Sequence, residues 1–140
     1  MEAPRLGVVL DASAAIAFLL DEPGAERVGS LLGSAGARMS TVNAAEVVDV
    51  LVRVHRGEPE TVITRVDELL STVVAPVSAS LELATQAGDL RARHFRRDQR
   101  VSLADCFVLA IAEQGDTIVT GNATLAAVAR IEGISVETLG

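Results

Sequence analysis

The stretch that most constrains this sequence is residues 6–20, where a short apolar run ends on an acid. The apolar run over 6–10 leads directly into Asp11, and an apolar helical pattern opens at Ser13. In an open parallel α/β sheet, ligands bind beyond the carboxyl ends of the strands. We therefore expect a buried strand that delivers the Asp11 carboxylate to such a site.

Short apolar runs alternate with helical patterns along the rest of the chain. We predict strands over 6–10, 37–39, 73–75, 117–120 and 134–137, and helices over 13–20, 25–32, 43–55, 59–70, 80–97, 102–114 and 123–130. Parallel strands linked by helices form a sheet that is covered on both faces. The sequence therefore predicts a three-layer α/β/α sandwich with a central, mostly parallel sheet, in one domain over residues 1–140.

Charge and composition exclude several classes of protein. The formal net charge of −7 argues against a nonspecific nucleic-acid coat or a membrane-surface protein. The N-terminus does not have the pattern of a signal peptide, and no apolar stretch is long enough to span a membrane. The lone Cys106 offers no disulfide framework and no zinc-site spacing. We therefore expect a soluble cytoplasmic protein that makes no membrane contact.

Three acids stand among apolar neighbours at the predicted starts of helices: Asp11, Glu46 and Asp105. Helix capping explains each of them taken alone. Glu46 follows Asn43 by three residues and Asp105 follows Ser102 by three, which is the spacing of a capping box. An acid at a helix N-terminus also interacts favourably with the helix dipole.

Taken together, the three acids indicate a metal site. The strand ends and helix starts of such a fold lie along one edge of the sheet, where three carboxylates repel one another unless a cation lies between them. Carboxylate oxygens without His or Cys suit Mg²⁺ or Mn²⁺, and such ions activate water for phosphodiester hydrolysis. The sequence has no Gly-rich phosphate loop, so cleavage of a nucleic acid is favoured over the handling of a nucleotide cofactor.

Four segments, in this order and nearly from end to end, resemble the PIN domain family and, within it, the VapC-type toxins of toxin–antitoxin pairs. They are an apolar run followed by Asp11-x-Ser13, the helix that carries Glu46, the run from Ser102 to Cys106, and the run from Val119 to Asn122. The combination is specific, although each segment alone is weak.

The resemblance implies a PIN-like fold and a metal-dependent endoribonuclease. Asp11, Glu46 and Asp105 match the family's metal-binding acids, and Ser13 and Thr120 match the hydroxyl groups that support them. The implied cofactor is Mg²⁺ or Mn²⁺. The implied partners are an RNA substrate such as tRNA or rRNA, a cognate antitoxin that blocks the site, and a second copy of the chain in a homodimer.

The sequence departs from the family at Asn122, where a fourth acid is common. An amide can offer a neutral oxygen, so we expect one ion to bind well and a second to bind weakly. Gly121-Asn122 also fits an ordinary turn. Asp116 is no substitute, because it precedes a strand roughly 13 Å long and should lie at the other end of the sheet. The alternative to an enzyme is a weakened PIN-like module that binds RNA or protein.

A local cluster of cations contrasts with the acidic chain. Every cation is Arg, and five of the twelve lie between residues 91 and 100. We expect Arg93, Arg96, Arg97 and Arg100 to contact RNA phosphates beside Asp105, since Arg matches phosphate geometry well. The alternative is that they are solvated cations at a helix C-terminus.

A different class of enzyme is disfavoured. Asp11 could be the covalent nucleophile of a phosphotransferase, but Ala12-Ser13 adds no second acid and the chain has no Lys.

The predicted helix over 14–20 and the segment 46–54 carry more apolar surface than one sheet face needs. A homodimer, an antitoxin or internal layers would bury that surface.

Overall fold

A single parallel sheet organises the molecule. The structure is a computed structural model that describes residues 7–34 and 36–140. In this part of the chain five strands pair in the order β3-β2-β1-β4-β5, and every pairing is parallel. The strands are β1 (Gly7–Leu10), β2 (Gly36–Ser40), β3 (Val74–Val77), β4 (Thr117–Thr120) and β5 (Ser135–Thr138). The predicted parallel sheet is therefore confirmed.

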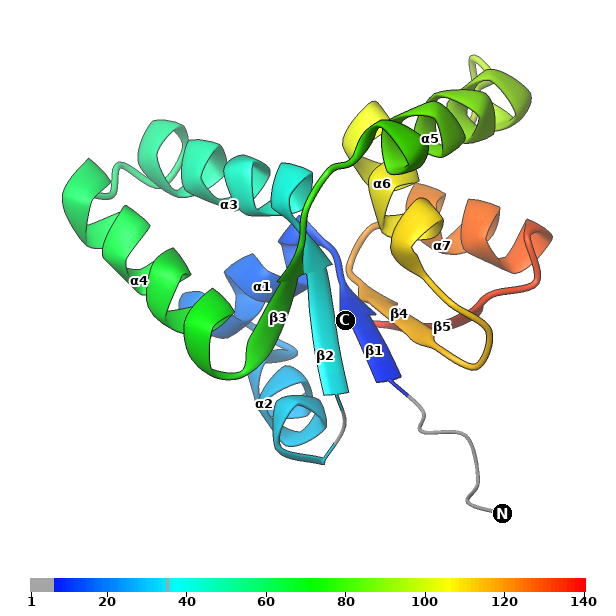
Figure 1. Cartoon of the computed structure of the whole chain (residues 1–140). Coiled ribbons are helices and arrows are strands. Elements are labelled where there is room, and N and C mark those ends of the chain that lie inside the picture. The colour runs from blue at the N-terminus through cyan, green and yellow to red at the C-terminus, as the bar shows by residue number, and fades with distance from the viewer. Residues whose placement is uncertain (1–6, 35) are drawn as a thin grey trace.

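Helices cover both faces of this sheet (Figure 1). One face is covered by α1 (Ala12–Leu19), α2 (Ala25–Ser34), α3 (Thr41–Arg53) and α4 (Pro59–Thr72). The other side carries α5 (Leu81–His94), α6 (Leu103–Ile111) and α7 (Ala123–Ile131). The predicted α/β/α sandwich is confirmed. None of the helices in the described residues combines the length and the apolar character that crossing a membrane requires.

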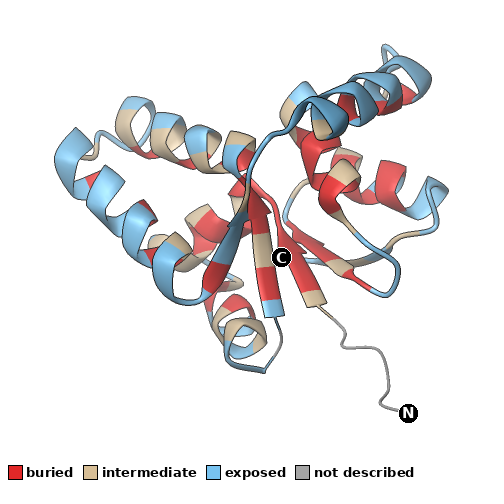
Figure 2. Cartoon of the chain, viewed as in Figure 1, coloured by how far each residue is buried: buried red, intermediate tan, exposed pale blue. Residues whose placement is uncertain are grey.

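The two cores are aliphatic and are divided by the alternation of strand residues. Val8 and Leu10 of β1 pack in the core under α1–α4, while Val9 packs in the core under α5–α7. In β4, Val119 packs in the core under α1–α4, and Ile118 packs in the core under α5–α7. Because both faces of the central strands are buried, these strands are continuous apolar runs (Figure 2).

The start of α3 differs from the prediction. The helix begins before Asn43, and Ser40 is its N-cap. Asn43 is therefore an interior helical residue and is fully buried. Glu46 lies farther along the same helix rather than at its start, so the predicted capping box of Asn43 and Glu46 is wrong.

Other boundaries differ for local reasons. β3 continues through Pro76, which a strand at the edge of a sheet tolerates. α5 ends three residues earlier than predicted, because Phe95 has extended backbone angles. α6 ends at Ile111 for the same reason, with Ala112 in extended geometry. The periodic patterns identified the elements, but not where the backbone leaves the helix.

The chain order places a switch point between β1 and β4. From β1 the chain adds β2 and β3 on one side, and it later adds β4 and β5 on the other. The carboxyl ends of β1 and β4 therefore lie side by side, with the following helices leading in opposite directions. Asp11 and Thr120 lie at this edge.

Asp116 lies at the opposite edge, where the sequence placed it. Its carboxylate accepts a hydrogen bond from the Arg38 guanidinium at 2.6 Å and one from the Glu113 backbone N–H at 2.7 Å. Burial would raise the pKa of Asp116, but these hydrogen bonds outweigh burial and hold the pKa below its usual value. Asp116 thus ties the start of β4 to β2.

We predict that Asp116→Ala lowers the free energy of unfolding by about 2 kcal/mol, because it leaves a charge-assisted hydrogen-bond network without its acceptor. The loss should shrink as the pH falls below about 4, since a carboxylate with a lowered folded pKa stabilises only while it is ionised. Urea unfolding measures it. Asp49→Ala, which removes an exposed ion pair with Arg53, is the control and should leave the free energy of unfolding nearly unchanged. Equal stability of both variants would contradict the prediction.

Candidate metal site

Asp11 is the most firmly held acid at the switch point. It follows β1 and is the N-cap of α1, where its Oδ1 accepts a hydrogen bond from the Ala14 N–H at 2.9 Å. The Thr120 hydroxyl donates to its Oδ2 at 2.5 Å, and the Ser13 hydroxyl lies 2.7 and 2.8 Å from its two oxygens. The Gly121 N–H donates to Ser13 Oγ at 2.8 Å. The predicted hydroxyl positions therefore do lie against this carboxylate.

Asp105 lies in the first turn of α6. Its backbone N–H donates to Ser102 Oγ at 3.0 Å, and its Oδ2 accepts from the Ser102 N–H at 3.3 Å. The predicted capping box of Ser102 and Asp105 is therefore confirmed. Asp105 is buried, as are most residues that follow it in α6. Capping accounts for its place on the helix, and the residue is nevertheless buried.

Glu46 completes the group from α3. It is half-buried, and burial is the largest cause that raises its pKa. The charges of Asp105 and Asp11 raise that pKa further. The three predicted acids, from β1–α1, α3 and α6, therefore lie close enough to act on one another electrostatically.

Burial also raises the pKa values of the other two acids. Burial is the largest cause that raises the pKa of Asp11, against the hydrogen bonds from Thr120, Ala14 and Ser13, and the charge of Asp105 raises it further. Burial likewise raises the pKa of Asp105, against its bonds with Ser102. A cation would relieve this cost, since a nearby positive charge favours ionised carboxylates.

The side chains are not gathered into a finished coordination shell. Within residues 7–34 and 36–140, no group of three or more His, Cys, Asp or Glu side chains is arranged closely enough to hold a metal ion. The acids meet across three elements as mutually repelling charges. Binding an ion through all three would require their side chains to turn toward a common point.

Asn122 has a defined structural role. Its Oδ1 accepts hydrogen bonds from the N–H groups of Thr124 at 2.9 Å and Leu125 at 3.2 Å, which makes it the N-cap of α7. Its own N–H donates to Thr120 Oγ1 at 2.9 Å. Asn122 is therefore a helix cap rather than a residue of an ordinary turn, and its amide oxygen already accepts two hydrogen bonds.

The predicted phosphate-binding arginines are not equivalent. Arg93 pairs with Asp89 at 3.0 Å and Glu132 at 3.3 Å, so its charge is largely compensated. Arg96, Arg97 and Arg100 are exposed beyond the end of α5. Arg96 and Arg100 make side-chain bonds to backbone carbonyls of the same segment.

One residue at the site was misread from the sequence. Asn43 is 0% exposed, and its Nδ2 donates to the Ala104 carbonyl at 3.1 Å, which joins α3 to the first turn of α6. Its Oδ1 is buried and has no hydrogen-bond partner among the described residues. In the sequence, Asn43 is a polar residue one helical turn before Glu46, and this spacing also fits a capping box.

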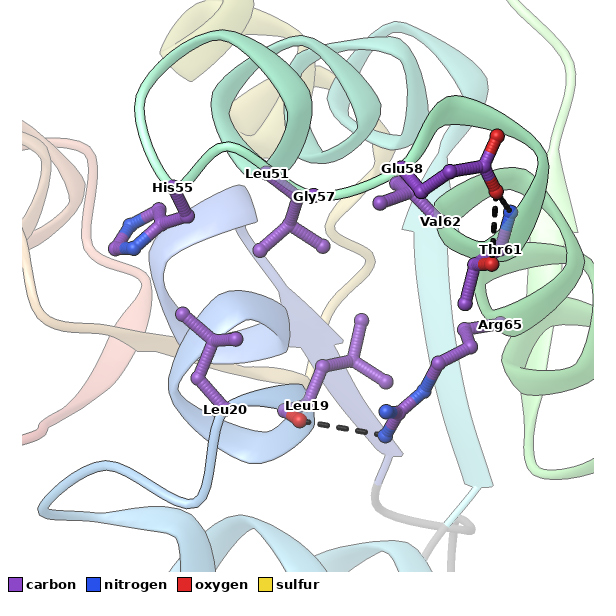
Figure 3. Close-up of a pocket in the computed structure, with 9 residues that line it drawn as sticks. All are labelled: Leu19, Leu20, Leu51, His55, Gly57, Glu58, Thr61, Val62 and Arg65. Atoms are coloured by element: carbon purple, nitrogen blue, oxygen red, sulfur yellow. Dashed lines mark hydrogen bonds between the residues drawn. The ribbon is translucent and has the colours of Figure 1, made fainter.

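An apolar groove lies away from the three acids, between α1, α3 and α4 (Figure 3). Leu20 is 39% exposed at its edge, and Arg65 crosses it to donate to the Leu19 carbonyl at 3.3 Å. The groove is lined by Leu19, Leu20, Leu51, His55, Gly57, Glu58, Thr61, Val62 and Arg65. Leu20, at the end of the predicted helix over 14–20, is therefore exposed here, whereas Leu51 of α3 is buried.

Comparisons with known proteins agree with this architecture. A family model described as PIN domain matches residues 8–132. No curated protein sequence matches the chain.

Several solved structures have a similar fold. The DNA-bound VapBC of Salmonella typhimurium has a TM-score of 0.70 at 21% identity, over 95% of this chain and 98% of that chain. VapBC2 of Rickettsia felis, bound to a promoter DNA fragment, has a TM-score of 0.69 at 16% identity, over 96% and 99%. VapC20 of Mycobacterium tuberculosis, a toxin that cleaves the sarcin-ricin loop, has a TM-score of 0.62 at 20% identity, over 96% and 90%. At these identities the likeness shows a shared fold.

We predict that the metal-free protein loses stability as the pH rises above about 4 through the raised pKa values of the three acids. Stability falls as the pH rises because, in that range, the folded chain binds more protons at these groups than the unfolded chain does. At pH 7.5 in EDTA, Glu46→Gln should therefore melt at a higher temperature than the wild type. Thermal unfolding followed by circular dichroism measures this difference.

The matched control is Asp49→Asn, one turn farther along α3. The hydrogen bond from Arg53 holds the pKa of Asp49 below its usual value, so removing this charge should not raise the melting temperature. A melting temperature of Glu46→Gln at or below that of the wild type would show that the carboxylates do not strain the fold.

Proposed function

The chain belongs to the PIN domain family, and from this premise we propose that it is a metal-dependent endoribonuclease and the toxin of a toxin–antitoxin pair. The observation that carries the proposal is the meeting of Asp11, Glu46 and Asp105 at the switch point, with a raised pKa on each. Burying three acids together is unfavourable for folding, so a function that uses their charge is the best account of them.

The donor chemistry at this edge suits Mg²⁺ or Mn²⁺, once the three side chains turn toward a common point. The donors are carboxylate oxygens, which these hard ions prefer. Asn43, one helical turn before Glu46, adds a buried Oδ1 that has no partner among the described residues. Asp11, Glu46 and Asp105 would hold the ion. When bound, such an ion supplies Lewis-acid stabilisation of phosphoryl charge and makes water a better nucleophile.

The chain's own side chains prepare this chemistry. The hydroxyl groups of Ser13 and Thr120 orient the Asp11 carboxylate, so that it need not reorganise when substrate arrives. Burial of Asp11 and Asp105 keeps water away from part of the site and strengthens electrostatic interactions there. The acids would therefore both position the reacting water and accept its proton.

We infer that the substrate is RNA. Arg96, Arg97 and Arg100 lie on the segment that leads into α6, and α6 carries Asp105. They would contact phosphates and position the strand. Arg93 is the weakest member of the predicted set, because two carboxylates already pair with it. A cytoplasmic location follows from this proposal, and the resemblance to VapC toxins adds a homodimer.

A second candidate is supported by Asn122. Because its Oδ1 caps α7, the position where the family commonly has a fourth acid offers no charge and no free amide oxygen. A chain weakened in this way could bind RNA without cleaving it. RNA binding that persists with Mg²⁺ and Mn²⁺ while no cleavage occurs would favour this candidate.

We predict that the purified protein cuts total cellular RNA into discrete fragments with Mg²⁺ or Mn²⁺ and not with EDTA. Asp11→Asn should lower the rate about 100-fold or more, because it removes a charge while keeping a good N-cap for α1. Gel electrophoresis of RNA labelled at its 5′ end measures the rate. Asp49→Asn, an exposed acid on α3, should cut at the wild-type rate. Equal rates for wild type and Asp11→Asn would assign the cleavage to a contaminating nuclease.

The antitoxin is proposed to dock an apolar helix in the groove between α1, α3 and α4. Leu20 is exposed at the groove, whose floor includes the buried Leu51 and Val62, and VapBC complexes share this fold. The groove lies apart from the acids, so docking there could anchor a segment that reaches the site. In this arrangement the groove would supply the affinity for the antitoxin, and the segment that reaches the acids would block cleavage.

We expect Leu20→Arg to abolish copurification with the product of an adjacent small reading frame, and to keep RNA cleavage at the wild-type rate. A charged residue in the groove would lose its solvation when an apolar helix docks. Ile63→Arg is the matched control, since Ile63 is 46% exposed on α4 and does not line the groove. If both variants copurify equally well with the partner, the groove is not the docking site.

A further inference from the structure

Asn43 connects two of the elements that carry acids. It lies on α3 one turn before Glu46, and its Nδ2 donates to the carbonyl of Ala104, the residue before Asp105. The side chain is wholly buried. A single amide group therefore fixes the distance between α3 and the first turn of α6, close to both carboxylates.

The position of this amide relates it to both helices. Asn43 lies one helical turn before Glu46 on α3, and the carbonyl that it binds precedes Asp105 on α6. The Asn43 NH₂ group has a second hydrogen that the Ala104 carbonyl does not use. The amide therefore stands between the two helices that carry these acids.

The oxygen of this amide is unused. Asn43 Oδ1 is buried without a hydrogen-bond partner among the described residues, which native proteins rarely allow. Asn122 offers a contrast, because its Oδ1 accepts two backbone N–H groups. Of these two amides at the site, Asn43 is the one that keeps an acceptor free beside the acids.

Folding alone does not require an amide here. The Ala104 carbonyl lies within α6, where the N–H four residues farther along the helix is its ordinary partner. A leucine has the same branched shape as asparagine, in a larger volume, and would bury no unpaired acceptor. The amide is therefore better explained by what it does for the acids than by helix packing.

We propose that Asn43 is a positioning residue of the metal site. Its hydrogen bond to the Ala104 carbonyl holds the first turn of α6, which carries Asp105, against the helix that carries Glu46. Its buried Oδ1 remains available as an acceptor for the hydration shell of a divalent cation. The proposal rests on the metal site of the proposed function and adds a residue that the sequence pattern had assigned to capping.

The test is calorimetric titration of Mn²⁺ into the purified protein without RNA. Asn43→Leu should weaken the Mn²⁺ dissociation constant about 10- to 100-fold, as the loss of a group that orients a ligand typically does. In EDTA its melting temperature should equal or exceed that of the wild type. Ser40→Ala is the control, because it removes the N-cap of α3 and should lower the melting temperature with no change in Mn²⁺ affinity.

The outcomes separate this proposal from the proposed function. If the wild type binds Mn²⁺ and Asn43→Leu binds it equally well, Asn43 is only a packing residue and the metal site stands. If the wild type binds no Mn²⁺, the metal site and the role of Asn43 are both overturned. If Asn43→Leu fails to fold, Asn43→Ala gives the same comparison, and weakened Mn²⁺ binding by that folded variant supports the proposal.

Discussion

The burial of carboxylates that also repel one another is the constraint on which the rest of the site depends. Asp11 and Asp105 are buried and Glu46 is half-buried, and burial is the largest cause that raises the pKa of each. Neighbouring groups hydrogen-bond to the two buried acids. Hydroxyls and a backbone N–H hold Asp11, and a capping box holds Asp105.

These supports also join the two layers of helices. The Thr120 hydroxyl links the end of β4 to Asp11 at the end of β1, and Asn43 links α3 on one face to α6 on the other. The site therefore forms only when both halves of the doubly wound sheet are assembled. The aliphatic cores supply the favourable free energy of folding, and the site uses part of it to hold like charges together.

The sequence was most informative where local chemistry and topology agree. An apolar run that ends on Asp11 and a buried helix that opens at Ser102 predict the strand, the edge and the capping box, because parallel strands end at one edge. Helix starts were less predictable. Asn43 is a residue type that often caps helices, but Ser40 takes that role and Asn43 lies inside the helix, where it contacts Ala104. The pairing of Arg93 with Glu132 also joins distant segments, which no local pattern encodes.

The most direct test of the central claim is anomalous X-ray diffraction from crystals soaked with Mn²⁺. The account predicts an anomalous peak at the carboxyl ends of β1 and β4, within coordination distance of the carboxylates of Asp11, Glu46 and Asp105. An anomalous peak elsewhere, with none at this edge while the crystals diffract well, would contradict it. The three acids would then be capping residues of a chain whose function does not depend on a metal ion at this site.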